Sequence, residues 1–270
     1  MHFKTSLMPL VALHAILLSG CSTLLETPHD RVVARDTAMA AGAFTAWGVS
    51  KWDWFKHSPK FKQEGWFGAD THAGGADKMG HLYMSYLLSE SMVWDFKRNG
   101  VPHAEDKAAL ASLGAMTLIE VGDASSSKYG FSGEDLLADA VGVGASWWLS
   151  KNPAWGEKID LRMEYWPSPG FSGKFDAAAD YSGMKHLLAI KGDGFSQLKG
   201  TPLEYLELHA GYYTRGFRSY DAGHWDIPER HTYVGVGLNL PRIFGKETVA
   251  GKFFQYYQVP HTYVAADQQF

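Results

Sequence analysis

The spacing of apolar residues in this 270-residue chain changes near the middle of the sequence. From about residue 37 to residue 150 the apolar residues recur at helical intervals, and from about residue 160 apolar and polar residues alternate. The alternation over residues 206–214 and 232–240 predicts antiparallel strands with two distinct faces. We therefore expect an α+β fold, in which an N-terminal bundle of about four short helices precedes a small antiparallel β-sheet.

Further segments can be assigned from the same spacing. The helical segments are residues 37–50, 76–97, 105–121 and 133–149, and the additional strand candidates are residues 162–166 and 253–257. No helical segment contains 18 uncharged apolar residues in succession, so the lengths indicate buried helices and not membrane spans. We expect the sheet to pack against the helices; in the alternative, an aromatic face of the sheet rests against lipid.

The first 21 residues have the features of a bacterial lipoprotein signal. Lys4 precedes an apolar stretch of about a dozen residues, which is too short to span a bilayer and is typical of a secretory signal. Residues 18–21, Leu-Ser-Gly-Cys, resemble the lipobox, whose cysteine receives a diacylglyceryl group before cleavage. Cys21 is the only cysteine, so we expect it to be acylated and expect neither an intramolecular disulfide nor a cysteine-based zinc site.

This signal sets the predicted domain organisation. We expect a lipoprotein signal peptide at residues 1–20, a lipidated tether at residues 21–36, a helical domain at residues 37–155 and an antiparallel β-rich region at residues 156–270. Acyl chains such as palmitate on Cys21 would hold the mature protein on a membrane. Ser22, and not an aspartate, follows the cysteine; by resemblance to enterobacterial lipoproteins, this indicates the periplasmic face of the outer membrane.

Charge and composition exclude three classes of protein. With 25 basic and 29 acidic side chains the net charge is −4, which leaves no electrostatic footprint for binding nucleic acid. Hydrophobic residues make up 46% of the chain and aromatic residues 14%, a composition that excludes a disordered chain or a coiled coil.

Polar side chains recur inside the otherwise apolar helical segments. Asp77, His81 and Ser85 are four residues apart and therefore share one helix face, next to Lys78. The following segments and the loop between them add further polar residues, namely Glu120, Asp123, Lys128, Ser132, Asp135 and Asp139. Ser132, with an aspartate three residues later, is a weak form of the capping box that begins many helices. Burying such groups costs several kcal/mol each unless they pair, so we expect them to meet.

Three interpretations of this cluster remain open. In the first, the carboxylates form a structural network by accepting hydrogen bonds from His81, Lys78 and backbone N–H groups. In the second, His81 is a general acid or base within a catalytic centre. The candidate catalytic residues are then His81, Asp77, Glu120 and Asp123.

In the third interpretation His81 binds a divalent metal together with Glu120, Asp123 or Asp139. The Glu-x-x-His pair that marks di-iron bundles is absent, so we expect no metal and no other cofactor. The remaining histidines lack the spacing of ligands and are predicted to be surface or interfacial residues; they include His72, His103, His186, His209, His224, His231 and His261.

The combined pattern resembles the YfiM-like family of predicted periplasmic lipoproteins. The similarity covers nearly the whole mature chain and rests on residues 74–81 (GGADKMGH), 85–86 (SY), 120–123 (EVGD) and 129–132 (YGFS), on Asp135, Asp139 and Gly142, and on C-terminal residues 180–183, 206–208, 211–216 and 236–240. A more distant similarity to VanZ-like membrane proteins rests on Asp77, Lys78, His81, Glu120, Ser132 and Asp135, although this chain differs in its short helices and lipid anchor. The resemblance implies a location and an architecture, and no particular reaction.

Two functions are compatible with these features. We favour a non-enzymatic, lipid-anchored envelope protein that binds an envelope lipid, a glycan or another protein. The alternative is a hydrolase that acts on a lipid or glycan phosphate through the histidine and carboxylates. The chain has no recognised nucleophile motif and no arginine cluster for phosphate in the helical segments, which weakens the alternative.

Overall fold

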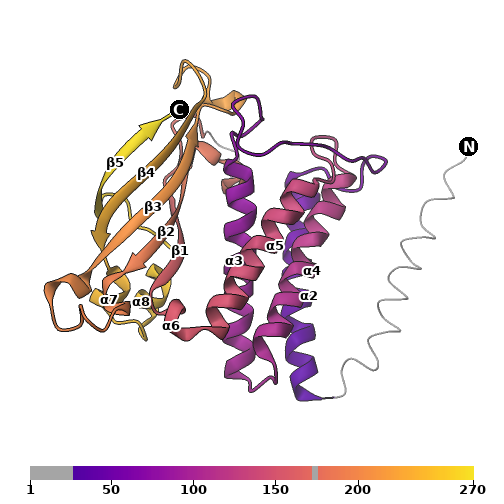
Figure 1. Cartoon of the computed structure of the whole chain (residues 1–270). Helices are drawn as coiled ribbons and strands as arrows, with labels where there is room; N and C mark the ends of the chain where they lie inside the picture. The colour runs from indigo at the N-terminus through magenta and orange to yellow at the C-terminus, as the bar shows by residue number, and fades with distance from the viewer. Residues whose placement is uncertain (1–26, 172–175) are drawn as a thin grey trace, which may run out of the picture.

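The computed structural model of the chain describes residues 27–171 and 176–270. A bundle of helices lies beside a five-stranded antiparallel sheet (Figure 1), so the predicted α+β fold is confirmed. The long helices are α2 (Pro28–Lys51), α3 (Ala76–Arg98), α4 (Ala104–Ala124) and α5 (Gly133–Lys151). The predicted signal peptide and the predicted acylation site, Cys21, lie outside the described residues.

Helix α2 begins nine residues before the start expected from sequence, at Pro28 instead of residue 37. The reason is a capping box: the Thr27 hydroxyl accepts the Asp30 N–H at 3.1 Å, and the Asp30 carboxylate accepts the Thr27 N–H at 3.3 Å. Val32 and Val33 then pack against the apolar core formed by α3 and α4. Residues 28–36, which were expected to be part of a tether, are therefore helical.

The sheet is a meander in which each strand pairs with the next. Its strands are β1 (Ile159–Tyr165), β2 (Met184–Lys191), β3 (Leu206–Arg215), β4 (Glu229–Leu238) and β5 (Tyr263–Gln269), in the order β1-β2-β3-β4-β5. Sequence spacing predicts β1, β3 and β4 and misses β2 and β5. In β5 only Tyr263 and Val264 are large apolar or aromatic residues, so the strand shows no clear alternation.

The strand predicted at residues 253–257 is wrong. These residues span the end of the short helix α8 (Val249–Phe254) and the turn after it. Thr248 caps this helix by accepting the N–H of Gly251 at 2.9 Å. The chain then runs along the free edge of β1, where the N–H of Gln258 donates to the carbonyl of Met163 at 3.0 Å.

The sheet buries its polar face, while the opposite face packs against α3 at β1 and β2 and is exposed over β3, β4 and β5. Arg162 on β1 donates to both carboxylate oxygens of Glu207 on β3, at 2.6 and 2.9 Å, and His209 lies 2.7 Å from the same carboxylate. All three residues are buried. The outward side of β3, β4 and β5 exposes aliphatic side chains, namely Leu208, Val234, Val236, Leu238 and Val264. The lipid-facing alternative expected an aromatic outward face. The outward face of these strands is aliphatic instead, and the aromatic Tyr233 on β4 is buried.

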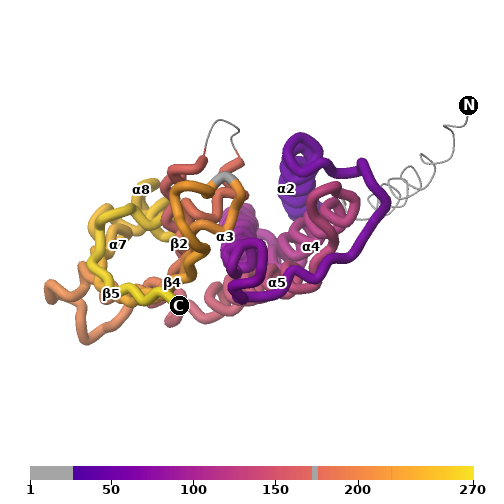
Figure 2. The backbone as a smooth tube through the Cα atoms, turned by 90° about the horizontal axis from the view of Figure 1, so that it is seen from above, coloured from indigo at the N-terminus to yellow at the C-terminus, as the bar shows by residue number. Residues whose placement is uncertain are grey.

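Helix α3 joins the two halves of the molecule. It contacts α4 and α5 on one side and β1, β2 and β3 on the other. The view from above in Figure 2 shows α3 between the sheet and the other long helices. The Tyr83 hydroxyl on α3 donates to the carbonyl of Tyr256 at 2.8 Å, which ties the helix to the segment beside β1. Among the residues that the structure describes, no helix is both long and apolar enough to cross a bilayer. The remaining helices, α6 (Pro153–Gly156) and α7 (Leu240–Phe244), are short.

Candidate functional site

A cavity of about 480 Å³ lies between α2, α3, α4 and the strands β1 and β2. Its walls are aromatic, methionine and aliphatic side chains: Phe44, Trp47, Trp52, Tyr83, Met84, Met116, Ile119, Tyr129, Met163, Tyr165, Tyr181 and Met184. Its polar lining consists of four carboxylates and two histidines, here called the acidic floor: Glu64, His72, Asp77, His81, Asp123 and Asp135. Ala43, Met84 and Ala178 line the cavity and are solvent-exposed, so the cavity opens to water beside them.

Two glycines place the start of α3 at the acidic floor. Gly74 and Gly75 have φ values of 60° and 89°, which other residues rarely adopt. A Cβ atom on Gly75 would lie 2.2 Å from the ring of Phe67. The helix begins immediately afterwards, so Asp77 falls in its first turn and His81 one turn later.

A close approach of α3 and α5 brings His81 and Asp139 together. A Cβ atom on Gly142 of α5 would lie 2.1 Å from the carbonyl oxygen of Leu82 on α3, so only glycine fits at this contact. Asp139, one turn earlier on α5, then places Oδ1 at 3.2 Å from Nδ1 of His81. The Ser85 hydroxyl lies in the same contact, where it donates to the carbonyl of Leu82 at 3.0 Å. Ser85 therefore contributes to helix packing and does not reach the carboxylates.

Lys78 neutralises one half of the site. Its ammonium is buried and lies 2.8 Å from Asp77, 3.1 Å from Glu64 and 2.7 Å from Asp135. Burial raises the pKa of Glu64, but the charges of Lys78 and His72 outweigh it and lower the pKa to about 2. Burial also raises the pKa of Asp77, against the opposing charge of Lys78. These contacts match the structural-network interpretation for this half.

His81, Glu120 and Asp139 form the other half, here called the inner cluster. Nδ1 of His81 lies 3.9 Å from Glu120 Oε1 as well as 3.2 Å from Asp139, and Nε2 lies 4.0 Å from Asp135. Burial lowers the pKa of His81, but its hydrogen bond to Asp139 and the charges of the neighbouring carboxylates raise the pKa to about 10. Burial raises the pKa of Glu120 to about 8. With only these side chains acting on it, His81 therefore carries a positive charge at neutral pH.

Asp123 and Ser132 also lie at the site. Asp123 accepts a 2.6 Å hydrogen bond from the indole Nε1 of Trp54, and burial raises the pKa of Asp123 to about 6. The N–H of Ser132 donates to Glu120 Oε2 at 2.9 Å, and its hydroxyl accepts the N–H of Asp135 at 3.2 Å. The predicted helix cap at Ser132 is thus confirmed, and it fixes Glu120 at the same time.

Four sequence predictions about polar residues need correction. Lys128 is exposed and lies 3.8 Å from Asp53, so it is outside the cluster. His186, His209 and His231 were predicted to be surface or interfacial residues, yet all three are buried in the sheet. The loop between α2 and α3 carries its charges without any period, so the sequence did not single out Glu64 and indicated only a surface or interfacial position for His72. Only the fold brings these two residues to the first turn of α3.

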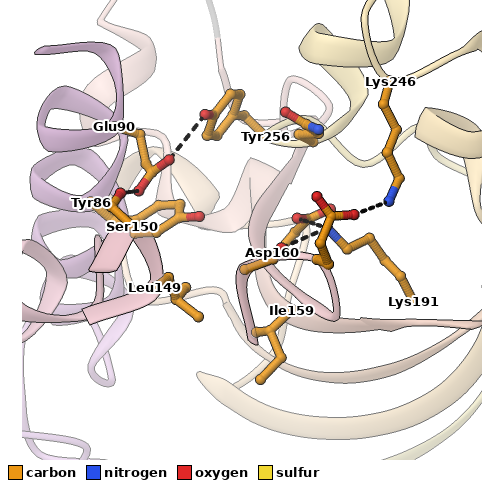
Figure 3. Close-up of a pocket in the computed structure, with 12 residues that line it drawn as sticks. Tyr86, Glu90, Leu149, Ser150, Ile159, Asp160, Lys191, Lys246 and Tyr256 are labelled. Atoms are coloured by element: carbon orange, nitrogen blue, oxygen red, sulfur yellow. Dashed lines mark hydrogen bonds and ion pairs between the residues drawn. The ribbon is translucent and has the colours of Figure 1, made fainter. Parts of the chain in front are cut away.

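A second, smaller cavity of about 140 Å³ lies between α3, α5 and the opposite end of β1 (Figure 3). Its charged groups are paired with one another or with nearby residues. Lys191 lies 2.5 Å from Asp160, Lys246 lies 2.8 Å from Glu157, and Glu90 accepts from the hydroxyl of Ser146 at 2.8 Å. These pairs satisfy the polar groups, so this cavity is a weaker candidate than the one beside His81.

Comparison with known proteins supports an envelope location. Residues 63–151 match a family model described as "Predicted periplasmic lipoprotein (DUF2279)". This range contains the acidic floor and all of α3, α4 and α5. Curated proteins and solved structures gave no match to the chain. The chain is thus similar over this range to a family of predicted periplasmic lipoproteins.

Proposed function

We propose that the chain is a lipid-anchored protein on the periplasmic face of the outer membrane and binds an amphiphilic envelope molecule without transforming it. The cavity with aromatic and methionine walls and an acidic floor carries this proposal. The anchor is supported by the lipobox-like residues before Cys21 and by the match to a periplasmic lipoprotein family. Ser22 supports the outer membrane over the inner membrane.

The charges of the floor indicate the head group of the ligand. Four carboxylates line the cavity, namely Glu64, Asp77, Asp123 and Asp135. The buried ammonium of Lys78 is shared among three of them, which leaves Asp123 without an ion pair among the described residues. A cationic group such as an amine therefore suits the floor, while the apolar walls suit an acyl or other hydrocarbon chain.

The same charges disfavour the alternative of phosphate hydrolysis. Among the described residues, the lining of the cavity includes neither arginine nor lysine. A phosphate there would face four carboxylates, and His81 would be its one cationic donor from the described lining. Within residues 27–171 and 176–270, the lining also offers no serine, threonine or cysteine as a nucleophile beside His81.

Short single-chain amphiphiles below their micellar concentration test the ligand class. The full acylated chain in phosphatidylcholine nanodiscs is titrated with octylamine or with octyl phosphate, and empty nanodiscs serve as the blank. We expect octylamine to change the tryptophan fluorescence, because Trp47 and Trp52 line the cavity, and to bind at least about tenfold more tightly than octyl phosphate. Tighter binding of octyl phosphate would overturn the proposed head group and favour the hydrolase.

Fractionation of cells tests the anchor separately. On a sucrose gradient of total membranes we expect the wild-type protein to sediment with the outer membrane. Cys21→Ser removes the acylation site, so we expect it to abolish incorporation of labelled palmitate and cleavage of the signal. Unchanged labelling and processing of this variant would disprove acylation at Cys21.

A further inference from the structure

The inner cluster contains buried carboxylate oxygens that no donor satisfies. The residues Glu120 and Asp139 are 1% and 0% exposed. Oε1 of Glu120 and Oδ2 of Asp139 have no hydrogen-bond partner within the described part of the chain. Such atoms normally have a partner, since leaving a buried acceptor unsatisfied costs about 1–3 kcal/mol and more when it is charged. The unpartnered Oε1 of Glu120 is the atom that faces Nδ1 of His81, at 3.9 Å.

The two halves of the site differ in how their charge is balanced. The group Glu64, His72 and Asp77 already holds a cation, because the ammonium of Lys78 lies within 3.1 Å of both carboxylates. In the inner cluster, neither Glu120 nor Asp139 has an ion pair with a lysine or arginine among the described residues. Within the described part of the chain, His81 is the one basic side chain within 4 Å of these carboxylates, and it is also a common metal ligand.

The distances in the inner cluster fit a metal ion. His81, Glu120 and Asp139 each offer one ligand atom, and these three atoms lie within 4.8 Å of one another. A tetrahedral Zn²⁺ with ligands at about 2.1 Å holds them about 3.4 Å apart. The two distances from Nδ1, 3.2 Å to Asp139 Oδ1 and 3.9 Å to Glu120 Oε1, lie on either side of that value.

We propose that His81, Glu120 and Asp139 bind a divalent transition-metal ion such as Zn²⁺. Imidazole nitrogen and carboxylate oxygen are both ligands that Zn²⁺ accepts, and three protein ligands leave the fourth tetrahedral position open. The open position would face the cavity, because the His81 side chain is 20% exposed and lines it. Ser132, whose N–H holds Glu120 Oε2 at 2.9 Å, would orient the second ligand. This site does not depend on which amphiphile enters the cavity.

Zinc binding to the untagged full chain tests the proposal. After removal of metal with EDTA, the protein in detergent is titrated with ZnCl₂ by calorimetry, and bound zinc is counted by mass spectrometry after dialysis. We expect one tightly bound ion in the wild type. Glu120→Gln and Asp139→Asn should each weaken binding by more than about 100-fold, since loss of even an outer-shell partner costs 10- to 100-fold. Both variants keep the size of the side chain and should melt cooperatively without metal.

Two control variants locate the ion. Asp267→Asn alters another carboxylate beside a histidine, 2.7 Å from His231, and should leave zinc binding unchanged. Glu64→Gln alters a carboxylate in the group formed by Glu64, His72 and Asp77, and this variant should also retain the zinc ion. Zinc that stays bound in folded Glu120→Gln and Asp139→Asn, or that is lost only in Glu64→Gln, contradicts the proposal. A wild-type chain that takes up no zinc contradicts it as well.

Discussion

The indole of Trp54 donates a 2.6 Å hydrogen bond from Nε1 to Oδ1 of Asp123, which joins the loop after α2 to the end of α4. Trp54 is 2% exposed and lies between two helices. A Cβ atom added to Gly48 of α2 or to Gly122 of α4 would lie within 2.4 Å of its ring. The loop is thereby held at the edge of the cavity, and one oxygen of Asp123 is committed to the fold.

Removal of the Asp123 carboxylate should therefore destabilise the protein. Asp123→Ala leaves the buried indole N–H without an acceptor, and we expect a loss of about 1–3 kcal/mol in the free energy of unfolding. Asp123→Asn keeps an oxygen in the same place and should stay within about 0.5 kcal/mol of wild type. Urea denaturation followed by circular dichroism measures both variants. Equal stability of Asp123→Ala and wild type would show that the hydrogen bond does not hold the loop.

The contact of α3 with α5 should tolerate no side chain at Gly142. Gly142→Ala places a methyl group against the carbonyl of Leu82, and we expect a loss of about 2–3 kcal/mol, typical of overpacking. Gly144→Ala is the matched control in the same helix, because its Cβ would meet no atom within 4 Å. This control should be neutral or stabilising by up to about 1 kcal/mol, since alanine is the better helix former. Thermal denaturation of the two variants and the wild type measures the difference. A Gly142→Ala variant as stable as the wild type would mean that α3 and α5 lie farther apart than the structure shows.

A buried histidine in the sheet should make stability depend on pH. Burial lowers the pKa of His186 from 6.5 to about 4 in the folded protein. Between pH 6.5 and pH 4 the unfolded chain binds more protons than the folded protein. The stability that depends on neutral His186 is therefore fully present above pH 6.5 and is lost as the pH falls toward 4. The loss amounts to about 3 kcal/mol, because a difference of one pKa unit corresponds to about 1.36 kcal/mol.

The variant His186→Gln isolates this contribution. It removes the titrating group, so the stability difference between wild type and variant should shrink as pH falls from 7 to 4. Urea denaturation at closely spaced pH values supplies the two curves. Parallel curves over this range would mean that His186 is not buried in its neutral form.

The spacing of apolar residues predicts the helices and strands that have a regular pattern. Helices α3, α4 and α5 and strands β3 and β4 follow from it because each has a consistent period. The spacing does not predict which face of the sheet is buried. Leu208 is exposed and Glu207 is buried, because Arg162 and His209 supply the partners that make a charged interior stable.

The candidate site is predictable only where its residues lie on regular helices. Asp77, His81, Glu120, Asp135 and Asp139 were expected to meet because burying them singly is costly, and the structure brings them together. Residues contributed by loops could not be found in the same way. Glu64 and His72 reach Lys78 and Asp77 through the fold of a segment that has no repeating pattern.

The affinity of octylamine for wild type and for Asp123→Asn tests most directly whether the acidic floor binds a cationic head group. The neutral probe octanol separates the contribution of charge from that of the apolar walls. In calorimetric titrations at pH 7.5 we expect Asp123→Asn to weaken octylamine at least about tenfold and to leave octanol within about twofold. If both probes bind the variant as tightly as wild type, or if neither binds wild type, the cavity is not the binding site that we propose.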